Sequence, residues 1–222
     1  MMLAIVRHAE SIENATKNTG FYQDPRPWTG SAAHELSRDL VGLTPRGFRQ
    51  ACWLTEALRP FTGPAPQVFT SEYRRAVDTA TIAFPTSQTL SVTGLLNEMH
   101  YGDVTYMGLP ELFATYPEEE HDRRHRKHTW TPPGPGGESL AVGVYARAAR
   151  FADIVRQAAT LGTVVAVTHL TTIMALRAVF EQRPVEDLVT EFRAHKMANA
   201  AILRYEIHGA RCHLVETIES KL

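Results

Sequence analysis

The stretch LAIVRH, residues 3–8, places an arginine and a histidine directly after four apolar residues. An unbroken apolar run of this length is typical of a strand that is buried on both faces of a sheet. A second stretch, VVAVTH at residues 164–169, also ends on a histidine. The two stretches therefore predict two buried strands, each followed by a histidine.

The rest of the chain alternates short strand candidates with helical patterns. Further strands are predicted at residues 68–70 and 89–93, and a terminal hairpin at residues 200–207 and 212–218. Apolar residues at helical spacing predict helices from residue 45 to a stop at Pro60, over 72–84, over 140–155 and around 173–180. This alternation predicts an α/β three-layer sandwich, with helices on both faces of a mostly parallel sheet. Because neither a linker nor a repeat divides it, we expect residues 1–222 to form a single domain.

The composition excludes several classes of protein. The chain of 222 residues is 44% hydrophobic and has a formal net charge of −1, which argues against disorder and against binding to nucleic acid or an anionic membrane. Its two cysteines, Cys52 and Cys212, have no metal-binding spacing. The first apolar run meets Arg7 too early for a signal peptide or a membrane span, so we expect a cytoplasmic protein.

Groups that can bind an anion follow three of the predicted strands. Arg7 and His8 follow the first strand, Ser71 and the pair at 74–75 follow the second, and His169 follows the strand at 164–167. Open α/β sheets bind ligands at the carboxyl ends of their strands. Arginine offers forked donors to phosphate oxygens, and histidine can serve as a donor or as a nucleophile. Each residue alone is more often an ordinary surface residue, but together they indicate a phosphate site.

The residues VRHAESIEN, 6–14, resemble the signature of the histidine phosphatase superfamily, which has the phosphoglycerate mutase-like fold. The family pattern is Arg-His-Gly-Glu with an asparagine six residues after the histidine, and Arg7, His8, Glu10 and Asn14 match it. Later stretches resemble further motifs of the family in the same order: LTPRGFRQA (43–51), SEYRRAVDTA (71–80), LLNEMHYG (95–102), PGGES (135–139) and VAVTHLTTI (165–173). The sequence departs from the pattern at Ala9 and Leu170, where the family commonly has glycine.

The resemblance implies a role for each matched residue. His8 would be the nucleophile that forms a phosphohistidine, and Glu98 would be the general acid and base, with His100 as a weaker candidate for that proton transfer. The phosphate would be bound by Arg7, Asn14, Arg75 and His169. Because arginines neutralise the phosphate, the implied activity is a metal-independent, acid phosphatase-like phosphomonoesterase without a cofactor. Its partner would be a small phosphate ester, or a phosphoprotein.

Alternative functions remain open at this point. The stretch NEMHYGD, residues 97–103, is close to the phosphoglycerate mutase pattern, but Met99 stands where mutases carry an arginine for the substrate carboxylate. This difference favours a phosphatase over a mutase-type phosphotransferase. A metal-dependent hydrolase has no ligand pattern in its favour. A non-catalytic module that binds phosphorylated ligands would need neither His8 nor Glu98.

Two segments are expected to be insertions on the substrate side, roughly residues 15–42 and 100–137. The charged run at 121–128 is predicted to be a solvated loop, or else a mobile lid whose Arg123, Arg124 or Lys127 contacts an anionic substrate. Tyr22 and Trp28 are candidates for lining the substrate entrance. The leaving group and the oligomeric state stay open.

Overall fold

A computed structural model describes residues 1–17, 38–63, 65–85, 90–208 and 211–222. Within these ranges, six strands form one sheet in the order β3-β2-β4-β1-β5-β6. The strands are β1 (Met2–Arg7), β2 (Gln67–Thr70), β3 (Leu90–Val92), β4 (Val164–Thr168), β5 (Ile202–His208) and β6 (Arg211–Ile218). The strands β1 to β4 run parallel. At one edge, β5 pairs antiparallel with β1, and β6 pairs antiparallel with β5. The mostly parallel sheet is thereby confirmed.

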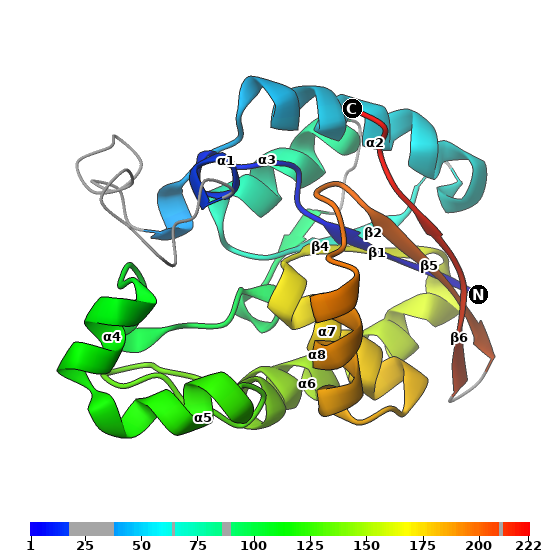
Figure 1. Cartoon of the computed structure of the whole chain (residues 1–222). Helices are drawn as coiled ribbons and strands as arrows, with labels where there is room; N and C mark the ends of the chain where they lie inside the picture. The colour runs from blue at the N-terminus through cyan, green and yellow to red at the C-terminus, as the bar shows by residue number, and fades with distance from the viewer. Residues whose placement is uncertain (18–37, 64, 86–89, 209–210) are drawn as a thin grey trace.

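Helices cover both faces of this sheet (Figure 1). One face carries α2 (Pro45–Thr62) and α3 (Arg74–Ala83), and the other carries α6 (Tyr145–Ala158), α7 (Leu170–Glu181) and α8 (Val185–Ala194). Strand β1 serves both cores, because Leu3 and Ile5 pack with the α6–α8 side while Ala4 and Val6 pack with the α2–α3 side. All four side chains are fully buried, which is why the strand reads as an unbroken apolar run. The three-layer sandwich is confirmed.

Smaller elements lie outside the three layers. They are α1 (Ile12–Lys17), α4 (Leu109–Thr115), α5 (Glu120–His125), a π-helical turn at Leu140–Val144, and short 3-10 turns at Arg38–Leu40, Gly94–Leu96, Gly102–Val104, Pro117–Glu119 and Ala159–Leu161. Helices α4 and α5 lie to one side of the sandwich (Figure 1), beside a small core of Val104, Leu112 and Trp130. No helix in the described ranges has both the length and the apolar character needed to cross a membrane.

The loop predicted at residues 121–128 is wrong in its first part, because α5 extends through His125. The helix is stabilised by ion pairs one turn apart, Arg124 with Glu120 at 2.8 Å and Arg126 with Asp122 at 2.6 Å. The sequence shows no apolar stripe here, because these polar contacts and not a buried face stabilise the turn.

Helix α2 begins as predicted but ends later. The hydroxyl of Thr44 accepts the backbone N–H of Gly47 at 2.9 Å and caps the helix. Pro60 does not end it, since a proline in the last turn removes only one hydrogen bond, and the helix runs on to Thr62. Gly47 lets α2 approach the loop after β1, because a Cβ atom there would lie 2.0 Å from the carbonyl oxygen of Glu10.

Candidate active site

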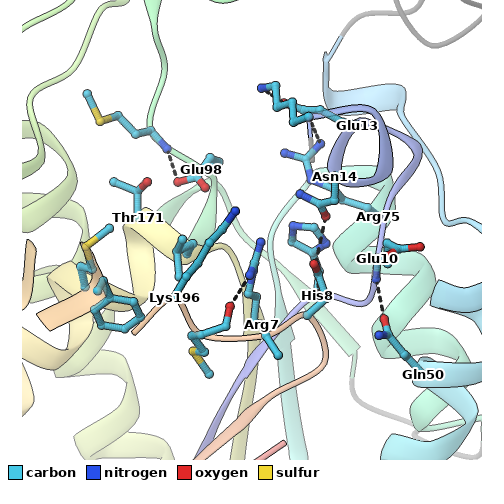
Figure 2. A pocket seen from close by; sticks show the side chains of 18 of the residues that line it. Arg7, His8, Glu10, Glu13, Asn14, Gln50, Arg75, Glu98, Thr171 and Lys196 are labelled. Carbon is cyan, nitrogen blue, oxygen red and sulfur yellow. Dashed lines mark hydrogen bonds and ion pairs between the residues drawn. The ribbon is translucent and has the colours of Figure 1, made fainter. Parts of the chain in front are cut away.

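The carboxyl ends of β1, β2 and β4 bring the predicted site residues together. Arg7 is the last residue of β1, Arg75 lies in the first turn of α3 after β2, and His169 follows β4. A cavity of about 500 Å³ opens at this edge, and the predicted residues His8, Arg7, Asn14, Arg75 and Glu98 line it (Figure 2). His169 does not line the cavity; it is fully buried and lies against His8, with 4.9 Å between the centres of the two rings.

His8 is held in one tautomer. Its Nδ1 lies 2.7 Å from the carbonyl oxygen of Ala9, an acceptor, so Nδ1 carries the proton and Nε2 carries the lone pair. Burial, together with the charges of Arg75 and Arg7, holds the pKa of His8 well below its ordinary value of 6.5. The ring is therefore neutral and has a free lone pair, as a nucleophile requires.

His169 has one ring nitrogen bonded and one without a partner. Its Nε2 lies 2.8 Å from the hydroxyl of Ser71, while its Nδ1 is buried and has no hydrogen-bond partner among the described residues. Burial and the nearby charge of Arg75 lower the pKa of His169 well below 6.5, so this ring is also neutral. The hydroxyl of Ser71 donates to Oδ1 of Asn97 at 2.9 Å, so Nε2 of His169 carries the ring proton and donates to Ser71, and Nδ1 carries the lone pair. An anion bound beside the ring would raise its pKa and favour protonation of Nδ1.

Two arginines of the cluster are almost completely buried. Arg7 donates to the carbonyl of Met197, and its Nε has no partner in the part of the chain that the structure describes. Burial lowers the pKa of Arg7 to about 10 and also lowers the pKa of Arg75. Both shifts show that the site holds positive charge at a cost, which a bound anion would offset.

Sequence analysis missed Arg38 and Glu13. Arg38 lines the cavity and donates to Glu13 at 3.2 Å and to the carbonyl of Met99 at 3.0 Å. Glu13 also pairs with Arg75 at 3.4 Å and with Lys17. Burial alone would raise the pKa of Glu13, but the three cations outweigh burial and lower it. Glu13 therefore stays ionised and fixes the positions of two guanidinium groups.

Asn14 is oriented by its neighbours. Its Oδ1 accepts from the backbone N–H of Ser11 at 3.2 Å and from Nδ2 of Asn199 at 2.9 Å. The remaining group of the side chain is the amide NH₂, a neutral donor at the edge of the cavity. Asn199, another residue that sequence analysis missed, also donates to the carbonyl of His8 at 3.0 Å.

Glu98 lies across the cavity from His8 (Figure 2). Its Oε1 accepts from the backbone N–H of Met99 at 2.9 Å. The preceding carbonyl, that of Asn97, accepts from Thr172 at 2.6 Å and from Arg147 at 3.1 Å. Both carboxylate oxygens of Glu138, from the predicted PGGES motif, in turn accept from Nε and Nη2 of Arg147 at 2.9 Å. The segment that carries Glu98 is thus fixed by contacts from two helices.

Other candidates from the sequence lie elsewhere. His100 does not line the cavity, and its Nδ1 accepts from the backbone N–H of Gly102 at 3.0 Å, which does not support its candidacy as the proton donor. Arg123 and Arg124 stack over Trp130 and Phe113, at 5.2 and 4.7 Å, and do not reach the cavity. Lys127 does line it. Tyr22 and Trp28 lie outside the described residues.

The donor set of the cavity suits an anion. In the described ranges, no group of three or more His, Cys, Asp or Glu side chains could hold a metal ion. The carboxylate of Glu13, which could be a metal ligand, is already bound to cationic side chains. Guanidinium donors around the cavity match the oxygens of a phosphate.

Comparison with known proteins agrees with this geometry. A 2,3-bisphosphoglycerate-dependent phosphoglycerate mutase from Cytophaga hutchinsonii is 30% identical over 142 residues, which are 63% of this chain and 57% of that protein. The match therefore spans less than two thirds of the length of the mutase.

Solved structures share the fold over almost the whole chain. An alpha-ribazole phosphatase from Shigella flexneri matches with a TM-score of 0.72 and 22% identity, covering 97% of this chain and 95% of that one. A mycobacterial glucosyl-3-phosphoglycerate phosphatase in complex with VO3 matches with a TM-score of 0.70 and 24% identity, covering 96% of both chains. A phosphoserine phosphatase from Entamoeba histolytica in complex with 3-phosphoglyceric acid matches with a TM-score of 0.72 and 18% identity, covering 99% of this chain and 98% of that one. At these identities the likeness establishes the fold.

The family follows from a profile match that covers nearly the whole chain. The profile of the histidine phosphatase superfamily, branch 1, matches residues 3–219. The matched range includes His8 and His169, the arginines of the cavity and the segment that carries Glu98. The chain belongs to the histidine phosphatase superfamily, branch 1.

Proposed function

We propose that this protein hydrolyses phosphate monoesters through a phosphohistidine intermediate on His8. The observation that carries the proposal is the state of that ring: it is neutral, its Nδ1 is bonded to the carbonyl of Ala9, and guanidinium groups surround it. A neutral imidazole with a fixed lone pair is suited to attack phosphorus. The proposal includes a metal-independent, acid phosphatase-like reaction, because the cationic side chains supply the charge neutralisation.

In the first step, the substrate phosphate binds to Arg7 and Arg75, with further hydrogen bonds from Asn14 and from Nδ1 of His169, which takes up a proton when the anion binds. Nε2 of His8 forms a bond to phosphorus while the bond from phosphorus to the ester oxygen breaks. Arginine contacts strengthen as charge moves onto the equatorial oxygens in the transition state. Glu98, across the cavity from His8, gives its proton to the leaving oxygen, and the alcohol departs.

In the second step, Glu98 acts as a base. Its carboxylate takes a proton from water, whose oxygen attacks the phosphohistidine and breaks the P–N bond. Inorganic phosphate and neutral His8 are the products, and Glu98 is again protonated. The same carboxylate thus serves both steps in opposite directions.

The mutase alternative meets a structural objection. Met99 is almost fully buried in the core beside α6 and α7, and its side chain supplies no positive charge to the cavity. A substrate carboxylate held as in the mutase pattern would therefore lack its arginine partner at this position. The similarity to the Cytophaga mutase keeps this alternative open to test. A module that binds phosphate esters without turnover is the second alternative to be tested.

The test is a rapid-quench experiment with a panel of ³²P-labelled phosphate esters and one phosphopeptide. We expect acid-labile label on wild-type protein, none on His8→Ala, and turnover that EDTA does not affect. Glu98→Gln should lose most activity with esters that have poor leaving groups. Mutase turnover of 3-phosphoglycerate exceeding hydrolysis would favour the alternative enzyme, and tight binding of every ester without turnover would favour the binding module.

A further inference from the structure

The cavity contains further cations besides the residues proposed to bind the phosphate. Lys127 follows α5, Arg193 lies in the last turn of α8, and Lys196 follows that helix; all three line the cavity. We refer to these three residues as the distal cation cluster. None of them has a carboxylate within 4.0 Å among the described residues, whereas Arg38 and Arg75 both pair with Glu13.

Neighbouring positive charges act on two members of the distal cation cluster. Burial, followed by the charges of Arg123 and Arg193, lowers the pKa of Lys127 to about 8. Burial and the charge of Arg7 lower the pKa of Lys196. Like charges that gather without a counter-ion destabilise one another, and a bound anion relieves this cost.

The cluster lies on the side of the cavity where the leaving group belongs. The carboxylate of Glu98 acts on the charge of Lys127, and Figure 2 shows Lys196 alongside Arg7, extending toward the space below Glu98 and Thr171. In the proposed reaction, Glu98 protonates the leaving oxygen. The alcohol that carries this oxygen must therefore extend from His8 toward Glu98 and the cluster.

An apolar wall accompanies the cluster. Leu170 and Met174 of α7, and Val189 and Phe192 of α8, line the same cavity. Side chains of this kind stabilise a ligand by removing apolar surface from water and offer it no hydrogen bonds. The leaving-group side of the cavity thus combines an apolar surface with unpaired positive charge.

We infer that the substrate is a phosphate monoester whose alcohol has an apolar body and a second anionic group, a carboxylate or a phosphate, which the distal cation cluster binds. This inference rests on the proposed function, because it specifies the leaving group of that reaction. It differs from the carboxylate contact of the mutase pattern, since Met99 is not a member of the cluster.

The experiment compares aryl phosphates that differ only at the far end. Phosphate esters of 3-(4-hydroxyphenyl)propionamide, of the corresponding propionate and of the corresponding alkyl phosphate have similar phenol leaving groups. For wild-type protein, we expect kcat/KM to be at least about tenfold higher for the two anionic esters than for the amide. Comparing the carboxylate with the phosphate ester shows which anion the cluster prefers.

The variants Lys127→Gln, Arg193→Gln and Lys196→Gln, singly and combined, test the cluster. In the triple variant, the preference for anionic esters should fall to within about twofold of unity, because the counter-charges are gone. Turnover of the amide should fall by a smaller factor than turnover of the anionic esters, because the amide has no second anion for the cluster to bind. Arg124→Gln is the matched control, because it removes an exposed cation of α5 that does not line the cavity.

Binding separates this inference from the proposed function. Calorimetry with the His8→Ala variant measures the same preference without turnover. Hydrolysis of the amide with no preference for the anionic esters, in rates or in binding, would overturn the inference and leave the phosphatase intact. A preference that survives in the triple variant would also overturn it. Anion preference in binding without any turnover would retain the second anion site and reject the enzyme.

Discussion

Replacing Glu13 by glutamine removes the negative charge that holds the cationic site together. The Glu13 side chain is only 4% exposed and contacts Arg38 at 3.2 Å, Arg75 at 3.4 Å and Lys17. Glutamine has almost the same volume and can still accept a hydrogen bond, so the change isolates the charge. Breaking a buried ion pair by removing one partner costs about 3–5 kcal/mol, and the retained hydrogen bond places this variant near the lower end, about 3 kcal/mol.

Urea unfolding at pH 7 measures this loss, because urea does not screen charges as guanidinium chloride does. A chain of this size should lose roughly 6–12 °C in Tm for that loss in stability. The pKa of Glu13 is lower in the folded than in the unfolded protein, so its contribution is fully present above about pH 4.5, its ordinary pKa. The difference in unfolding free energy between wild type and variant should therefore be constant between pH 6 and 8, and it should shrink as the pH falls below about 4.5.

The control is Glu56→Gln, which removes a carboxylate from the exposed pair with Arg59 on α2. A surface pair of this kind contributes at most about 1 kcal/mol, so the control should hardly change Tm. Enzymatic activity gives a second measurement, because Arg38 and Arg75 lose their common anchor, and kcat/KM should fall at least about tenfold. A loss of stability for Glu13→Gln no larger than that of the control would refute the account of the site.

Three further predictions concern the same edge of the sheet. In phosphate-free buffer, the ¹³Cε1 NMR signal of His8 should stay that of a neutral ring from pH 8 to well below 6.5, since burial lowers its pKa; a titration midpoint at or above 6.5 would contradict this. In the unfolded chain the His8 ring takes up a proton below about pH 6.5, whereas in the folded chain it does not, so the free energy of unfolding should also decline as the pH falls below that value. Ser71→Ala should lower kcat/KM about tenfold and change the ¹⁵N shifts of the His169 ring, whereas Ser71→Thr should restore both. Gly47→Ala should cost at least about 2 kcal/mol in urea unfolding, because its Cβ would meet the backbone of Glu10, and an unchanged midpoint would show that α2 can move aside.

Local sequence patterns predicted most of the layers. The run at 3–6 predicted β1 because every residue in it is buried, and the capping pair Thr44-Pro45 predicted the start of α2. Both are short-range signals that neighbours in the chain supply. The same logic failed at Pro60, because the loss of one hydrogen bond in the last turn does not end a helix. It also failed in α5, because surface ion pairs stabilise this helix and leave no apolar pattern in the sequence. It also missed α8, which begins directly after the proline that marks the preceding break.

The core of the candidate site could also be predicted from the sequence. Parallel strands end at the same edge, so Arg7, His8 and His169 had to lie near one another once the strands were identified. The family motifs added Asn14 and Glu98, whose roles remain proposals.

Residues that act at the site through long-range contacts needed the tertiary structure. Arg38 reaches Glu13 across 25 positions of the chain, and Asn199 reaches His8 across 191. The distal cation cluster joins the end of α8 to the segment after α5 at one cavity. The amino-acid sequence by itself determined the sheet, most of its covering helices and the residues proposed to bind the phosphate, because periodicity and motif spacing are local. Only the folded chain determined which charges are paired and which stay unpaired, because Coulomb interactions depend on distances in space and not on distances along the sequence.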